Sequence, residues 1–320
     1  MFYLIFPEAG DHVMTFISVI VSCLLTFVVL VGLKDKLPRD GGREFAVNGT
    51  KSVGKPRGAG LLLIFVLVVT SLLFLPVTTE LMIYLVLTVV EMLSGYFDDA
   101  SSKPWGRLIK GLLDFMVAVI CTITWLSHNT NTFHMAHSGA EVTIPRPLYA
   151  CLIILLVFAS INVVNCTDGV DGLCGTLSAI TLFSVFLIQN RLDQNGPYTT
   201  FNLIAIVVLL VYLWFNASPS SMLMGDAGSR AYGFLIALAF LKLGYPLLFI
   251  PLTIVMILDG GLGLVKITLI KVTHHNPMKN IRTPLHDHFR KNKGWSDTQV
   301  VARFAVIQAI IALAIIFAQF

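Results

Sequence analysis

The sequence predicts an all-α polytopic integral membrane protein that forms a single domain over residues 1–320. Hydrophobic residues make up 56% of the chain and charged residues only 12%, whereas about 25% of the residues in soluble domains are charged. Many apolar runs reach the length of about 17–25 residues that a helix needs to cross a bilayer. These runs must be helical, because lipid offers no partner to unpaired backbone groups and the alternation of barrel strands is absent.

The apolar runs predict about ten membrane-spanning helices. They cover residues 12–33, 58–78, 80–97, 108–128, 147–164, 172–190, 200–215, 229–243, 246–270 and 299–320. With ten spans, both ends of the chain lie on the same side of the membrane. The polar chemistry of the protein must then lie mainly at the helix ends and in the connections between them.

The distribution of basic residues predicts the orientation. Lys and Arg are concentrated in one set of connections, while the other set holds only Arg146, Arg191 and Lys242. The positive-inside rule makes the basic set cytoplasmic and both termini external. Since the net charge of +4 mostly follows from this bias, we expect membrane lipids as partners and no nucleic acid.

Carboxylates occur in three short polar breaks on the predicted cytoplasmic side. Asp98 and Asp99 end the third span, Asp168 and Asp171 lie between the fifth and sixth spans, and Asp226 precedes the eighth. Each could alone be a solvated acid or a helix cap. Together they offer hard oxygen ligands from several loops, which is what Mg²⁺ prefers, with waters and substrate phosphates completing its octahedron.

Two longer cytoplasmic segments supply positive charge beside these acids. The first, residues 51–60, is rich in Gly and basic residues, and the second, residues 282–291, contains His286, Asp287 and His288. Basic residues beside a membrane often only contact anionic lipid. In the company of acids and Gly-rich turns they indicate a site for a diphosphate with its metal, and a His-x-His zinc site is disfavoured because the other candidate ligands are oxygens.

These segments resemble the polyprenyl-phosphate N-acetylhexosamine-1-phosphate transferase superfamily. The matching motifs are Asp98-Asp99, Asn162-x-x-Asn165-x-x-Asp168-Gly-x-Asp171-Gly, Met-Gly-Asp226-x-Gly-Ser and Thr283-Pro-Leu-His286-Asp287-His288-Phe. The last motif and the 51–60 loop are similar to the bacterial phospho-N-acetylmuramoyl-pentapeptide transferase family within it. The chain departs from that family at Asp287, where the family has a third histidine, and at Leu223, where it has an aromatic residue.

The resemblance implies an enzyme of the bacterial cytoplasmic membrane. Such an enzyme transfers phospho-N-acetylmuramoyl-pentapeptide from UDP-N-acetylmuramoyl-pentapeptide to undecaprenyl phosphate, giving lipid I and UMP. It implies Mg²⁺ as cofactor and a homodimer as assembly. A transferase of another UDP-N-acetylhexosamine is the alternative within the superfamily.

The resemblance also implies roles for individual residues. The catalytic candidates are Asp98 as base or acceptor-positioning group, Asp99, Asp226 and His286, and the metal ligands would be Asp226 and Asp168. The substrate-binding candidates are Lys51, Lys55, Asn165, Asp168, Asp171, Asn216, Leu223 and His288. Either direct attack by the lipid phosphate or a double displacement through an aspartyl intermediate is open at this point.

A transporter is the alternative from another functional class. Transporters place functional charges near the bilayer midplane, and Glu91, Asp114 and Asp259 lie within predicted spans. However, no repeated halves are visible, and Asp114 follows Lys110 by four residues, so we expect these two to pair on one helix face. The sequence therefore favours an enzyme.

Overall fold

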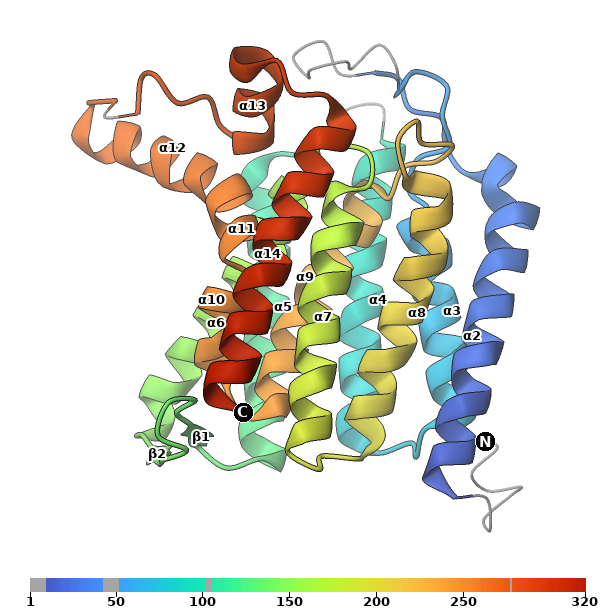
Figure 1. Cartoon of the computed structure of the whole chain (residues 1–320), viewed down its shortest axis with the longest axis vertical. Coiled ribbons are helices and arrows are strands. Elements are labelled where there is room, and N and C mark those ends of the chain that lie inside the picture. The colour runs from blue at the N-terminus through green and yellow to red at the C-terminus, as the bar shows by residue number, and fades with distance from the viewer. Residues whose placement is uncertain (1–9, 43–51, 102–104, 277) are drawn as a thin grey trace.

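The computed structural model describes residues 10–42, 52–101, 105–276 and 278–320, which form an upright bundle of helices (Figure 1). Over these residues the sheet structure is one hairpin, β1 (Thr132–His134) paired with β2 (Glu141–Thr143). The helical elements are α2 (Asp11–Leu33), η1 (Lys34–Lys36), α3 (Gly60–Phe74), α4 (Thr79–Ala100), α5 (Arg107–His128), α6 (Arg146–Thr167), α7 (Leu173–Arg191), α8 (Pro197–Asn216), α9 (Gly225–Leu243), η3 (Pro246–Leu248), α10 (Phe249–Leu252), α11 (Ile254–Met256), the π turn η4 (Ile257–Gly261), α12 (Leu262–Thr273), α13 (Leu285–Lys293) and α14 (Asp297–Gln319).

The all-α membrane class is consistent with these helices. Seven of the described helices, α2, α4, α5, α6, α7, α8 and α14, are long and apolar enough to cross a membrane, and a bent pair raises the number to eight. Every predicted range contains helix, but α3 has only 15 residues and α9 carries three charged side chains. The number ten therefore stays a prediction.

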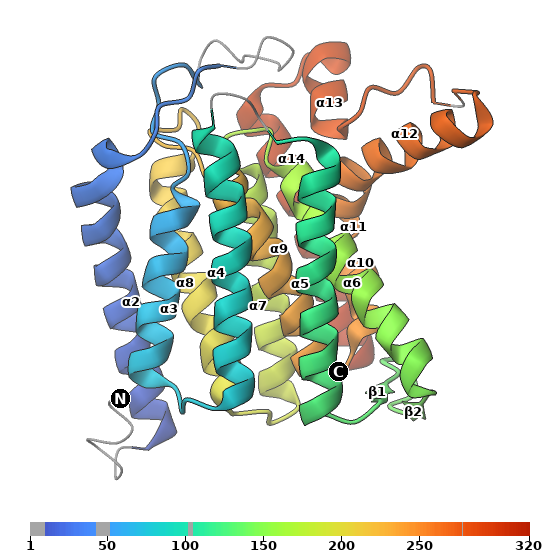
Figure 2. The same cartoon turned by 180° about the vertical axis from the view of Figure 1, so that it is seen from behind.

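Residues 246–270, predicted as one span, form a bent pair of helices. The chain breaks at Thr253, where the two pieces are bent by 63°, and it makes the π turn η4 at Ile257–Gly261. Gly260 and Gly261 weaken helical structure here. As a result α12 leaves the bundle at an angle (Figure 2), and Asp259 lies in the irregular turn.

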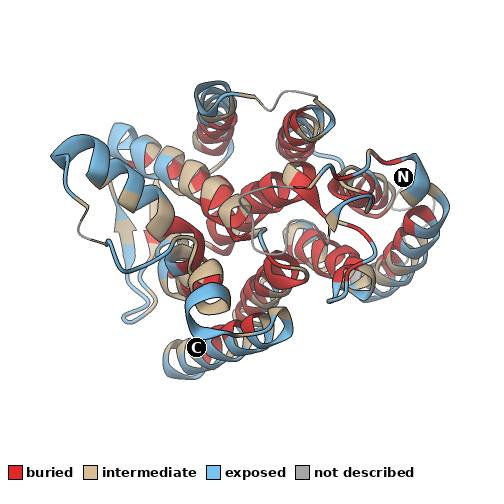
Figure 3. Cartoon of the chain, turned by 90° about the horizontal axis from the view of Figure 1, so that it is seen from above, coloured by how far each residue is buried: buried red, intermediate tan, exposed pale blue. Residues whose placement is uncertain are grey.

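Helix α9 lies at the centre of the bundle, where buried residues gather on the inward faces of the surrounding helices (Figure 3). It packs against α3, α4, α6 and α7, and nearly all of its residues are buried. Small residues permit this close approach: a Cβ on Gly60 of α3 would lie 2.0 Å from the backbone nitrogen of Gly228. The first turn of α9, which carries Asp226, is thereby fixed against its neighbours.

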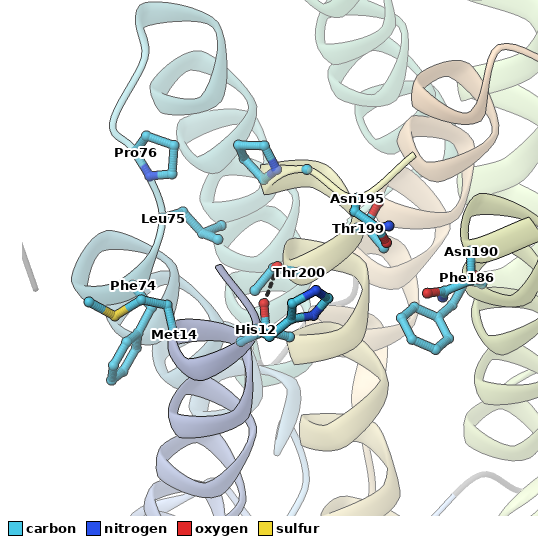
Figure 4. A pocket seen from close by; sticks show the side chains of 13 residues that line it. His12, Met14, Phe74, Leu75, Pro76, Phe186, Asn190, Asn195, Thr199 and Thr200 are labelled. Carbon is cyan, nitrogen blue, oxygen red and sulfur yellow. Dashed lines mark hydrogen bonds between the residues drawn. The ribbon is translucent and has the colours of Figure 1, made fainter. Parts of the chain in front are cut away.

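The bundle has two chemically different ends. The first and last described residues lie at one end, opposite α13 (Figure 1), as an even number of crossings predicts. That end holds a cavity of about 410 Å³ lined by His12, Asn190 and Asn195, among others (Figure 4). The hydroxyls of Thr15 and Thr200 share a hydrogen bond of 2.9 Å there. The predicted acidic residues lie at the other end.

Candidate active site

Three carboxylates meet where the end of α4 touches the start of α9. One oxygen from each of Asp98, Asp99 and Asp226 lies within 4.8 Å of the other two. Two glycines make this contact possible. A Cβ on Gly95 would lie 2.3 Å from the carbonyl carbon of Asp226, and Gly225 has a φ of +73° and would place a Cβ 2.2 Å from Asp99 Oδ2. The backbones therefore approach more closely than other residues allow.

Two cations lie against these carboxylates. Lys110 from α5 contacts Asp98, and its Nζ is 2.9 Å from Asp226 Oδ2. Arg57 brings Nη2 within 2.7 Å of an Asp99 oxygen and 3.8 Å of Asp226. Because like charges this close repel one another unless positive charge is nearby, the two cations make the cluster of acids possible. The donor set of three carboxylate oxygens also fits Mg²⁺.

Arg57 is held in place by the carboxylate of Asp40. Asp40 Oδ1 accepts a hydrogen bond of 2.9 Å from Arg57, and Asp40 Oδ2 accepts one of 2.6 Å from Ser52. Burial favours a raised pKa for Asp40, but the hydrogen bonds from Ser52 and Arg57 outweigh it and hold that pKa below its ordinary value. The pKa of Arg57 is raised, because the nearby Asp99 and Asp40 outweigh burial. Both groups are therefore charged at neutral pH.

Leu223 joins this loop to the segment before α9. Its backbone nitrogen donates to the Pro56 carbonyl at 2.8 Å, and its carbonyl accepts from the Ala59 nitrogen at 3.0 Å. Position 223 thus fixes Arg57 relative to Asp226 through the backbone, whichever side chain it carries.

Lys55 and Asp171 form a second charged pair beside the cluster. Lys55 Nζ lies 3.4 Å from Asp171 Oδ2 and donates to Ser220 Oγ at 2.9 Å. The Ser220 backbone nitrogen also donates to Asp171 at 3.0 Å. The 52–59 loop, the turn before α7 and the segment after α8 are therefore tied together.

The two predicted carboxamides are engaged within the protein. Asn216 accepts a hydrogen bond from the Gly172 nitrogen and donates one to the Met222 carbonyl, each at 2.9 Å. Asn165 donates to Ser229 Oγ at 2.9 Å. Asn216 is buried, so its direct role is to hold the 171–173 turn against the segment that leads to α9.

His286 is buried at the start of α13 and paired with Asp259 of the π turn. Its backbone nitrogen and its ring Nδ1 approach the Asp259 carboxylate at 2.7 and 2.8 Å. A carboxylate at Nδ1 favours the proton on that nitrogen and leaves Nε2 as the reactive position. Nε2 faces Gly169, where a Cβ would lie 2.3 Å away, and so it points at the backbone beside Asp168.

The other residues of the last motif have separate partners. Asp287 forms an ion pair of 3.5 Å with Arg290, and His288 Nδ1 accepts a hydrogen bond of 3.3 Å from the Arg282 backbone nitrogen. The motif therefore presents one buried histidine, His286, and one half-buried histidine, His288.

The structure brings Asp98, Asp99 and Asp226 together as predicted, but Asp168 does not belong to that group of three. Lys51 lies outside the described residues. The predicted pairing of Asp114 with Lys110 is wrong: Asp114 pairs with Arg230 of α9, while Lys110 turns toward the acids.

Sequence reasoning missed three contributors. Arg57 and Arg230 counted only as basic residues of cytoplasmic connections, and the pairing of Asp259 with His286 was not foreseen. The one available signal was spacing, because Arg230 follows Asp226 by four residues and must share its helix face.

Comparison with known proteins supports a common origin with transferases. Residues 81–244 match the family described as glycosyl transferase family 4. A protein of Treponema pallidum (strain Nichols) named phospho-N-acetylmuramoyl-pentapeptide-transferase is 35% identical over 319 residues, covering 94% of this chain and 88% of its own. A protein of the same name from Staphylococcus carnosus (strain TM300) is 27% identical over 320 residues, covering 94% and 97%.

Proposed function

This chain belongs to glycosyl transferase family 4, among the phospho-N-acetylmuramoyl-pentapeptide-transferases, and we propose that it makes lipid I. It transfers phospho-N-acetylmuramoyl-pentapeptide from the UDP-linked donor to undecaprenyl phosphate and releases UMP. The observation that carries the proposal is the convergence of Asp98, Asp99 and Asp226 with two cations at one end of an apolar bundle.

The place of the cluster suits these two substrates. A lipid phosphate lies at headgroup level, whereas a UDP-linked sugar is soluble, so their reaction requires a site at the membrane edge. The sequence bias of Lys and Arg supports the cytoplasmic edge of a bacterial cell membrane as this place.

We also propose that the protein forms a homodimer. Measurement of the mass of the purified protein in detergent tests this proposal.

Mg²⁺ fits the carboxylate oxygens of the cluster. Asp226, with Asp98 and Asp99, would hold it. Asp168, which lies outside this group of three, is our proposed further ligand. When bound, the cation would neutralise the diphosphate and stabilise UMP as the leaving group.

The residues of the chain divide between acceptor and donor. Asp98 and Lys110 lie on the acceptor side, where Lys110 attracts the lipid phosphate and Asp98 orients it or removes its remaining proton. Because the second pKa of a phosphate is about 6, much of the acceptor is already a dianion. On the donor side we propose Asn165, Asp168, Asp171 and Leu223 for the nucleotide, with Asn216 shaping this part of the site through the 171–173 turn. We propose Lys51, Lys55, His286 and His288 for the phosphates.

The reaction we propose is a single displacement. An oxygen of the lipid phosphate attacks the sugar-linked phosphorus, and the bond from that phosphorus to the UMP oxygen breaks. UMP should then appear only when undecaprenyl phosphate is present. A stoichiometric burst of UMP from the enzyme and donor without lipid contradicts this step and supports the double displacement.

The carboxylates that a transporter would use have internal partners. Glu91 and Asp114 lie against Arg230, and Asp259 holds His286. The alternative function, transfer from another UDP-N-acetylhexosamine, differs from lipid I synthesis only in the donor. Measuring the activity of the purified protein with each donor distinguishes these two functions.

A further inference from the structure

A second group of charges lies within the bundle beneath the acidic cluster. Arg230 of α9 contacts Asp114 of α5, and its Nε lies 3.3 Å from Glu91 Oε2 of α4. The Asn162 amide adds a hydrogen bond of 3.1 Å to Asp114. Only 2% of the Arg230 surface is exposed, and Glu91 and Asp114 are equally buried. We call Glu91, Asp114 and Arg230 the lower triad.

The lower triad joins the same three helices, α4, α5 and α9, as Lys110 and the acidic cluster. On α5 Asp114 follows Lys110 by four residues, and on α9 Arg230 follows Asp226 by four, so each pair shares a helix face about one turn apart. The sign of the charge is reversed within both pairs. Since α4 packs against both α5 and α9 (Figure 2), the same three helices are bridged twice, by Lys110 above and by Arg230 below.

Stability alone does not explain the lower triad. Removing charges from water is costly, and replacing a buried ion triad with well-packed hydrophobic residues of similar volume is often neutral or stabilising. The triad is also incompletely satisfied, because Arg230 Nη1 has no hydrogen-bond partner in the described part of the chain. A directional contact between three helices, in contrast, fixes their rotation and register in a way that apolar packing does not.

We propose that Arg230 is a positioning residue for the transferase reaction. Through Glu91 and Asp114 it holds α4, α5 and α9 in the register that sets Lys110 between Asp98 and Asp226. Without it, the helices remain packed but the oxygens of Asp98 and Asp226 no longer converge. The activity measurement for this inference rests on the proposed function. The measurement of metal binding does not depend on that function.

The decisive variant is neutral at all three positions: Glu91→Gln, Asp114→Asn and Arg230→Met together. We expect thermal unfolding in detergent near that of the wild type, with kcat lowered and the dissociation constant for Mn²⁺ raised, each by about tenfold or more, the usual cost of removing outer support from a site. The KM for the UDP-linked donor should change little, since the triad touches no substrate. A folded triple variant with wild-type kcat and Mn²⁺ affinity overturns the inference.

A matched control lies at the opposite end of the same helices. Lys242 of α9 and Glu80 of α4 form an ion pair of 2.6 Å that is largely, though less completely, buried. The double variant Glu80→Gln with Lys242→Met should keep kcat and Mn²⁺ affinity. If it loses both to the same extent as the triple variant, the effect belongs to general packing and the inference fails.

Three single variants, Asp114→Asn, Arg230→Met and Arg230→Lys, keep the test decisive if the triple variant does not fold. Asp114→Asn leaves Arg230 paired with Glu91 but removes the charge that Arg230 and Asn162 contact on α5. We expect the same direction of change in kcat and Mn²⁺ affinity, and wild-type values contradict the proposal. Arg230→Lys retains the charge and should recover part of the loss seen in Arg230→Met. Absence of lipid product from the wild type counts against the proposed function instead, and the Mn²⁺ titration then tests the triad alone.

Discussion

The ammonium group of Lys110 lies 2.9 Å from Asp226 Oδ2 and also contacts Asp98. One side chain from α5 therefore bridges the ends of α4 and α9, which are far apart in the sequence. Arg57 does the same for Asp99 and Asp226 from the preceding loop. The site is a set of carboxylates and cations that neutralise one another. The carboxylates can bind a metal ion, and the cations can bind phosphates.

Replacing Asp226 with Asn tests the principal metal ligand. The amide preserves the shape but loses the charge, so turnover should fall by about two to three orders of magnitude, the loss typical of a group that stabilises transition-state charge. Thermal unfolding and Mn²⁺ titration are measured on the same sample. We expect a folded protein with weakened Mn²⁺ binding, and near-normal turnover rules Asp226 out as the main ligand.

Replacing Gly95 with Ala tests the contact between α4 and α9. The new Cβ would lie 2.3 Å from the Asp226 backbone, so the helices must separate, at a cost of about 1–3 kcal/mol. A lower unfolding temperature and reduced turnover should appear together. Gly111→Ala on α5 is the control, because its Cβ meets nothing within 4 Å, and equal loss in both variants refutes this account of the contact.

Replacing Asp259 with Asn tests the orientation of His286. The ring would lose the carboxylate that fixes the proton on Nδ1, and kcat should fall by about tenfold or more, by analogy with outer partners of metal-binding histidines. An unchanged kcat in a folded variant shows that the pair is only structural.

Replacing Asp40 with Asn tests how the 52–59 loop is held. The folded-state pKa of Asp40 is lowered, so its charge stabilises the fold above the unfolded value of about 3.9, and this contribution disappears as the pH falls through the lower folded value. Between about pH 5 and 7 the wild-type carboxylate is ionised in both the folded and the unfolded state, so the variant should unfold at a lower temperature than the wild type. The difference should shrink at more acid pH; a difference independent of pH contradicts the charged role.

The sequence predicts much of the architecture and the convergence of acids. Hydropathy locates the helices because burial in lipid requires long apolar runs, and alternation of helix direction brings Asp98, Asp99 and Asp226 to one end. Spacing along the chain also predicts shared helix faces. It does not predict which neighbouring helix each face meets.

That limit explains the wrong and missing predictions. Asp114 has Lys110 within reach on its own helix, yet it pairs with Arg230, because α9 brings a second cation to the buried side. The π turn that carries Asp259 also packs closely against α6, where a Cβ on Gly260 would lie 2.6 Å from the Val163 carbonyl. Such contacts arise only in the folded bundle.

The transfer itself is tested most directly with purified protein, undecaprenyl phosphate, Mg²⁺ and one radiolabelled UDP-sugar at a time. We predict labelled lipid from UDP-N-acetylmuramoyl-pentapeptide, with one UMP released for each lipid formed. Asp226→Asn, measured in parallel, should form almost none. Labelled lipid from UDP-N-acetylglucosamine but not from the pentapeptide donor, or no labelled lipid from any donor, contradicts the proposed function.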